Sequence, residues 1–140
     1  MTTNDTTSAK TRTITLTDRP PVTIREDAWP VIASAADKDF DGQYEFQANC
    51  VSRWNLNVRQ HADQRTLVYG RYAYRTNYQN AREYDAKAGV LLAAPTGAEL
   101  VAAIKDVAAM LASQEHHEND ALRWTAVSVE CIADLPAEAL

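Results

Sequence analysis

The sequence predicts an α+β fold, in which a small antiparallel sheet built on a central β-hairpin is packed on one face by two or three helices. Apolar and polar residues alternate over Arg53–Arg59, and a second strand-like run, Thr66–Tyr74, follows a polar break at Asp63 and Gln64. Two such runs around a short break are typical of a hairpin. Apolar residues at helical spacing then appear in the C-terminal third, which supplies the helices.

Length and composition favour a single domain. The chain has 140 residues, of which 46% are hydrophobic and 24% charged, as in ordinary globular proteins. We expect a polar, disordered tail over 1–12 and one domain over 13–140. Without an apolar run long enough to span a bilayer, and without a secretory signal in the tail, the sequence favours a cytoplasmic protein. Cys50 and Cys131 are then expected to be reduced thiols.

The segment before the hairpin predicts two strands, a helix and a loop. In order, these are a strand over Thr13–Thr17, a turn over Asp18–Pro21, a strand over Val22–Ile24, a helix that begins at Glu26 and a polar loop over Asp37–Gly42. Acidic residues in a first turn, with Pro30 inside it, favour that helix. Its expected buried stripe is Trp29, Ile32, Ala33 and Ala36. Residues 44–51 fit either a helix or a strand.

The segment after the hairpin predicts two helices. Over Thr76–Gly89 we expect a polar connection with a short helix capped by Asn80, then a short strand over Val90–Leu92. Thr96 and Glu99 form the pattern of a capping box, and the apolar face that follows comprises Leu100, Ile104, Val107, Ala108 and Leu111. A final helix over Asp120–Leu135 is expected to turn Leu122, Ala126, Val129 and Ala133 inward, although residues 122–132 also tolerate a strand.

The predicted hairpin has two unlike faces. If Asp63 and Gln64 form a two-residue turn, Ala62 pairs with Arg65 and the register of both strands follows. The core face then carries Trp54, Leu56, Val58, Leu67, Tyr69 and Ala73. The opposite face carries Arg53, Asn55, Asn57, Arg59, Tyr72 and Tyr74. Arginine and tyrosine are frequent anchors of protein interfaces, and on a sheet they also stack on bases. This face is therefore the candidate binding surface, unless its arginines and tyrosines simply pack on one another in water.

Charge favours a protein partner over nucleic acid. The net charge is −5, yet Arg53–Arg75 contains five arginines and a single acid, so this stretch is +4 and the remainder −9. An acidic chain is a poor general ligand for a polyanion. A protein partner is thus the favoured interpretation, and nucleic-acid binding through the same face is the alternative.

The motifs for metal binding and catalysis are incomplete. Asp37, Asp39 and Asp41 match the first half of a calcium-binding loop, but its twelfth position is Ala48 instead of a glutamate. They remain weak metal candidates beside an ordinary Asp/Gly-rich turn. The pair His116–His117 lacks the spacing of a zinc motif. Neither cysteine has a local signature of a nucleophile. We therefore expect no cofactor and no enzyme activity, with a small metal-dependent enzyme as a minor alternative.

Four phrases resemble a known family. They are Ile14–Val22, Trp29–Ala33, Val58–Asp63 and Cys131–Pro136. Together they resemble a family of small uncharacterised proteins carried by Mu-like transposable bacteriophages and related prophages of proteobacteria. The resemblance implies a cytoplasmic accessory protein of an infected or lysogenic bacterium, and it supplies no catalytic residues. The working hypothesis is a non-enzymatic phage accessory protein that binds a host macromolecule. The oligomeric state is left open.

Overall fold

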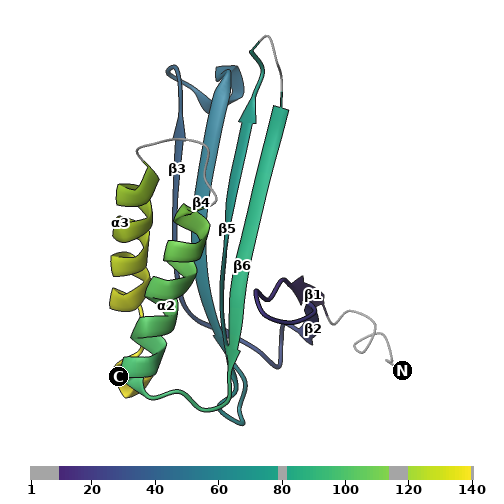
Figure 1. Ribbon diagram of the computed structural model, residues 1–140, viewed down its shortest axis with the longest axis vertical. Helices are drawn as coiled ribbons and strands as arrows, with labels where there is room; N and C mark the ends of the chain where they lie inside the picture. Colours follow the sequence, from purple (N-terminus) through teal and green to yellow (C-terminus); the bar gives the residue numbers. More distant parts are fainter. Residues whose placement is uncertain (1–9, 79–81, 114–119, 140) are drawn as a thin grey trace, which may run out of the picture.

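An antiparallel sheet with helices on one face forms the body of the protein. The computed structural model describes residues 10–78, 82–113 and 120–139. Four strands follow one another in a meander, in the order β3 (Val31–Phe40), β4 (Cys50–Gln60), β5 (Thr66–Thr76) and β6 (Arg82–Leu92). Helices α2 (Gly97–Ala112) and α3 (Asp120–Ala133) lie side by side on one face of this sheet (Figure 1). The fold is thus α+β, and the hairpin β4–β5 occupies its centre, as predicted.

A second, smaller sheet lies on the side of the meander away from the helices (Figure 1). It consists of β1 (Thr11–Ile14) and β2 (Val22–Arg25), which pair antiparallel. A short 3-10 turn, η1 (Glu45–Gln47), joins β3 to β4, and another, η2 (Ala137–Ala139), follows α3. The first strand begins at Thr11, inside the predicted tail, whereas residues 1–9 lie outside the described part. Within the described residues, neither helix is both long and apolar enough to cross a membrane.

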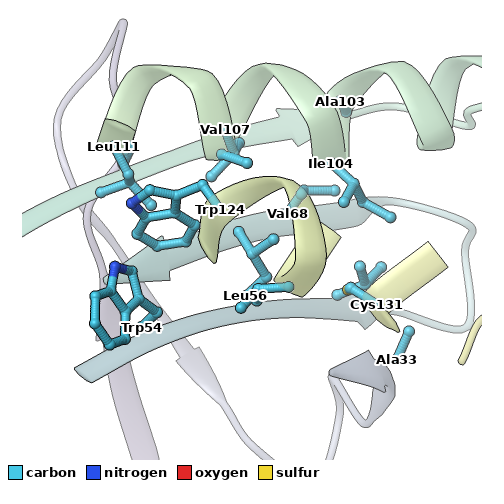
Figure 2. Close-up of a cluster of buried hydrophobic side chains, with 14 of the residues drawn as sticks. Ala33, Trp54, Leu56, Val68, Ala103, Ile104, Val107, Leu111, Trp124 and Cys131 are labelled. Atoms are coloured by element: carbon cyan, nitrogen blue, oxygen red, sulfur yellow. The ribbon is translucent and has the colours of Figure 1, made fainter. Parts of the chain in front are cut away.

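Two hydrophobic cores lie on opposite faces of the meander. The larger core lies between the sheet and the helices, and Figure 2 shows its principal side chains pointing toward one another. They include Trp54, Leu56 and Val68 from the sheet, Ile104, Val107 and Leu111 from α2, and Trp124 and Cys131 from α3. The smaller core lies beneath β1–β2 and contains Ile14, Leu16, Ile24, Trp29 and Leu67. The sheet is therefore buried on both faces, but only near the β1–β2 end.

The segment predicted as a helix from Glu26 is a strand. In β3, Ala33 and Ala35 both pack on the helix-side core, which is the two-residue period of a strand. Pro30 directly precedes the strand, where its missing N–H does no harm, and its carbonyl accepts a hydrogen bond from Gln60 N at 3.1 Å. Alanine favours helices intrinsically, but pairing with β4 along the whole strand outweighs that preference.

The predicted polar connection after Thr76 is also mostly strand. In β6, Tyr84, Ala86 and Ala88 face the core, while charged residues alternate with them on the other face. That alternation predicts a strand, but the many charged residues made the segment resemble a polar connection. Asn80, the predicted cap of a short helix, lies outside the described residues. The open question over residues 44–51 is resolved by η1 and the start of β4.

Both predicted C-terminal helices are present, but one is rotated. In α2 the capping box forms, since Thr96 Oγ1 accepts from Glu99 N at 3.1 Å and Glu99 Oε1 accepts from Thr96 N at 2.9 Å. Its buried face is the predicted one. In α3 the inward residues are Trp124, Val127, Ser128 and Cys131, whereas Leu122 and Val129 are 78% and 59% exposed and Ala126 and Ala133 are exposed as well. The large indole of Trp124 fills the core, so it decides the rotation of the helix.

Candidate binding face

The turn of the central hairpin is one residue longer than the sequence predicts. The last β4–β5 pair is Gln60 with Thr66, and Gln64 adopts a positive φ of 80°. Gln64 N donates to His61 O at 2.9 Å, and His61 N donates to Arg65 O at 2.9 Å. This is a three-residue loop with a left-handed residue at its end, a common hairpin turn that usually takes glycine at that place. The predicted two-residue turn is therefore wrong, and Arg59 pairs with Leu67 instead of Val68.

The shift by one residue moves both tyrosines to the helix side. Tyr72 is fully buried, with its ring between those of Trp54 and Tyr84 at centroid distances of 5.8 and 6.0 Å. Tyr74 is half-buried, and its hydroxyl lies 3.7 Å from Cys50 Sγ. Neither tyrosine shares a face with Arg53, so their prediction as surface contacts is wrong.

The same shift corrects the predicted core face. The β4 residues Trp54, Leu56 and Val58 are buried under the helices, as predicted. From β5, the prediction placed Leu67, Tyr69 and Ala73 with them, but all three lie on the opposite face. There Leu67 and Tyr69 pack in the smaller core, under β1–β2.

Arg59 is a structural residue. It is only 8% exposed, although it lies on the same face of β4 as Arg53. Arg59 Nη1 donates to Trp29 O at 2.9 Å, and Nε donates to Tyr69 Oη at 2.8 Å. It therefore ties β4 to β5 and to the segment before β3, and its prediction as a contact for a partner is wrong.

The uncovered part of this face is polar and carries net positive charge. It comprises Lys38, Arg53, Asn55, Asn57, Arg71, Arg75, Glu83, Asp85 and Lys87, which we call the open face. The pairing places Arg71 between Asn55 and Lys87 in one cross-strand row. Five cationic side chains against two carboxylates give a net charge of +3, in a chain whose total is −5. Arg53, Asn55 and Asn57 are the predicted residues that the structure brings together here.

Most charges of the open face are paired, but the pairs are exposed. Arg71 donates to both carboxylate oxygens of Asp85, at 2.9 and 2.6 Å, and this hydrogen bonding raises the pKa of Arg71. Glu45 lies over the face from η1 and accepts from Lys38 and Arg53, and the hydrogen bond from Lys38 is the main reason why its pKa is lowered. Such exposed pairs contribute little to stability, so a partner's carboxylates can replace them.

Two exposed aromatic rings stand at the rim of the open face. Tyr44 and Phe46 flank Glu45, which accepts from Lys38 and Arg53, so both belong to the loop at the β3–β4 end of this face. Their rings stack at 5.6 Å and are 49% and 81% exposed. Sequence analysis missed them as functional candidates. The available signal was a pair of aromatic residues in an otherwise polar loop, because an aromatic ring left in water commonly marks a contact site.

The half-motif for calcium does not form a site. Asp37 and Asp39 belong to β3 and accept from Arg123 of α3, at 2.9 and 3.1 Å. Asp41 Oδ1 accepts from the backbone N–H groups of Asn49 and Cys50, at 2.8 Å each, and Oδ2 accepts from the Tyr78 hydroxyl. The bond from Cys50 N is the main cause of the lowered pKa of Asp41. Asp37 and Asp39 thus share Arg123, whereas Asp41 binds other groups, so the three weak metal candidates do not converge on one point.

Other chemical candidates are equally dispersed. Within residues 10–78, 82–113 and 120–139 no three His, Cys, Asp or Glu side chains gather as a metal site. His116 and His117 lie outside the described residues. Cys131 is fully buried, and its burial raises the pKa of the thiol to about 12.

The open face contains a hollow of about 420 Å³ over β3 and β4, and two smaller ones. One, of about 200 Å³, lies over Arg53, Arg71, Arg75, Glu83 and Asp85. The other, of about 190 Å³, lies between β1 and the sheet. Comparisons of the chain with protein-family models, curated proteins and solved structures found no match. What the open face can do is therefore inferred from its own chemistry.

Proposed function

We propose that this chain is a non-enzymatic binding protein that holds another protein on its open face. The observation that carries the proposal is the asymmetric cover of the sheet. The helices cover much of one face, whereas β1–β2 covers only one end of the other (Figure 1). What is left carries guanidinium groups and carboxamides, with two stacked aromatic rings at its rim. Arginine and aromatic side chains are the residues that most often dominate binding energy at protein interfaces.

Mixed charge favours a protein partner over a nucleic acid. Glu83 and Asp85 lie among the cations of β5 and β6, and Glu45 lies over Lys38 and Arg53. A phosphodiester backbone would be repelled by each of these carboxylates, while a protein surface can present opposite charges to both signs. The resemblance to phage proteins favours a bacterial protein as the partner, which would place the chain in the cytoplasm of its host cell.

Variants on the open face test this function. Tagged full-length protein would be used to capture partners from a bacterial lysate, beside Arg75→Glu, Phe46→Ala and the control Lys105→Glu. Arg75 has no ion pair among the described residues, and Lys105 is an exposed residue of α2, which packs on the other face. We expect a specific partner whose affinity falls about tenfold or more in Arg75→Glu and Phe46→Ala, but not in the control.

Two outcomes would contradict the proposal. One is a set of partners whose affinity for both face variants equals their affinity for the wild type. The other is binding of duplex or single-stranded nucleic acid at low salt, with an affinity that falls steeply as salt rises, because that result assigns the face to a polyanion.

A further inference from the structure

The hollow between β1 and the sheet is built from five polar side chains of four strands. They are Arg12 of β1, Asn55 and Asn57 of β4, Arg71 of β5 and Lys87 of β6, and we call this site the cationic groove. Its apolar base includes Ile14 and Tyr69. The groove thus lies at the β1–β2 end of the open face.

The wall that β1 provides is fixed to the edge of the sheet. Thr17 N donates to Gly89 O at 2.8 Å, and Gly89 N donates to Thr17 Oγ1 at 3.2 Å. Gly89 allows the close approach, because a Cβ atom there would lie only 2.5 Å from Thr15 O. Ile14 anchors the same strand in the smaller core. The groove is therefore a formed site and not a gap between loosely packed parts.

Hydrogen-bond donors in the groove outnumber acceptors. Arg12 uses Nε to donate to Glu26 Oε1 at 2.9 Å, and Arg71 uses Nε and Nη2 for Asp85. The other N–H groups of both guanidinium ions have no acceptor among the described residues. Asn57 Nδ2 donates to Asn55 Oδ1 at 3.2 Å, and the amide hydrogens of Asn55 have no acceptor in the part of the chain that the structure describes. Lys87 makes no hydrogen bond or ion pair within the described part of the chain. A site rich in unused donors is complementary to an anion with several oxygens.

Local charge supports the same ligand. Among the described residues, the lining cations Arg12, Arg71 and Lys87 and the adjacent Arg59 are offset by two carboxylates in ion-pair contact with them, Glu26 and Asp85. The net charge there is +2, although the chain carries −5. An anion would therefore enter a locally positive site in a protein whose remaining surface repels it.

We propose that the cationic groove binds a phosphate group, carried by the protein partner as a phosphorylated side chain. A carboxylate is planar and can be satisfied by one guanidinium edge, whereas a phosphate dianion has three charged oxygens and suits donors that come from several sides. Here the donors come from β1, β4, β5 and β6 around one hollow. This inference rests on the proposed function, because it names the chemistry that one end of the open face recognises.

A titration with inorganic phosphate tests the groove without a partner. The side-chain amide signals of Asn55 and Asn57 and the Nε signal of Arg71 would be followed by NMR in the full chain, at constant ionic strength maintained with sodium chloride. We expect saturable shifts, with a Kd at least about tenfold weaker in Lys87→Gln and unchanged in the control Lys105→Gln. Asn55→Asp, which puts a carboxylate into the groove, should abolish the shifts.

The outcomes separate the two proposals. Shifts that sodium chloride alone reproduces, or that persist unchanged in Lys87→Gln and Asn55→Asp, overturn the phosphate site. A second titration uses N-acetyl-phosphoserine amide and its unphosphorylated form. Binding of the phosphorylated form at least as tightly as inorganic phosphate supports a phosphorylated side chain as the ligand. Binding of inorganic phosphate alone overturns that assignment. Loss of phosphate binding with intact, Arg75-dependent capture would refute only the groove. Phosphate binding without any captured partner would refute only the proposed function.

Discussion

Replacing Arg59 by methionine tests whether this arginine stabilises the fold, in contrast to the surface residue Arg53 on the same strand. Methionine keeps most of the length and apolar stem of Arg59 but none of its donors. The change leaves Trp29 O and Tyr69 Oη without the bonds of 2.9 and 2.8 Å that Arg59 supplies. A hydrogen bond from a charged donor contributes about 1.5–3 kcal/mol, and a buried acceptor left unpaired has a similar cost. With the second bond only partly buried, we expect Arg59→Met to lower the free energy of unfolding by about 2–4 kcal/mol.

Arg53→Met is the matched control, since it makes the same chemical change on the same face of β4. The side chain of Arg53 is 52% exposed and, over the described residues, pairs only with Glu45, so its loss should change stability by less than about 0.5 kcal/mol. Urea unfolding followed by tryptophan fluorescence would measure both. For a chain of this size the expected loss in Arg59→Met corresponds to a fall in Tm of about 5–15 °C. Equal stability of the two variants would refute the assignment of Arg59 to the interior.

Three further predictions concern other parts of the fold. Gly89→Ala should destabilise the protein by about 1–3 kcal/mol and speed amide exchange in β1, because the added Cβ would lie 2.5 Å from a backbone oxygen; unchanged exchange would contradict the close contact. Thr96→Ala should lower the free energy of unfolding by about 1 kcal/mol. Because hydrogen bonding to Thr96 lowers the pKa of Glu99, the contribution of the Glu99 carboxylate to stability is complete above its ordinary pKa of 4.5 and is lost as pH falls through the lowered value. A urea midpoint of the wild type that does not change with pH in this range would argue against this contribution. Cys131, with a thiol pKa of about 12 and full burial, should resist alkylation at pH 8 while Cys50 reacts, and mass spectrometry finding both modified in the folded protein would disprove this.

Local signals predicted the parts of the fold that local physics decides. The capping box of Thr96 and Glu99 marks the start of α2 with no help from the rest of the chain. Alternation around Trp54 gives both the strand β4 and its buried face. Where tertiary contacts decide, the same approach failed. Ala33 and Ala36 are good helix formers, and only pairing with β4 makes their segment a strand.

Three of the six residues predicted for the candidate surface lie on the open face. Arg53, Asn55 and Asn57 lie on β4, whose own alternation fixes their face, and they are on the open face as expected. Tyr72 and Tyr74 lie on β5, whose face depends on the turn. Gln64 occupies a left-handed position that glycine or asparagine usually takes, so the sequence gives no sign of the extra turn residue.

The register of β5 is hidden for a second, deeper reason. Thr66, Leu67 and Val68 are all fully buried, because at this end of the sheet the helices cover one face and β1–β2 covers the other. A strand buried on both faces is a continuous apolar run, and such a run carries no information on which residue points where. The first residue of β5 that indicates which face points to water is Arg71, because it lies beyond the cover of β1–β2 and its charged group must reach water. The residues of a strand should therefore be assigned to its two faces starting from the half-exposed end. On β5, that rule places Arg71 and Arg75, and not the tyrosines between them, on the face that a partner can touch.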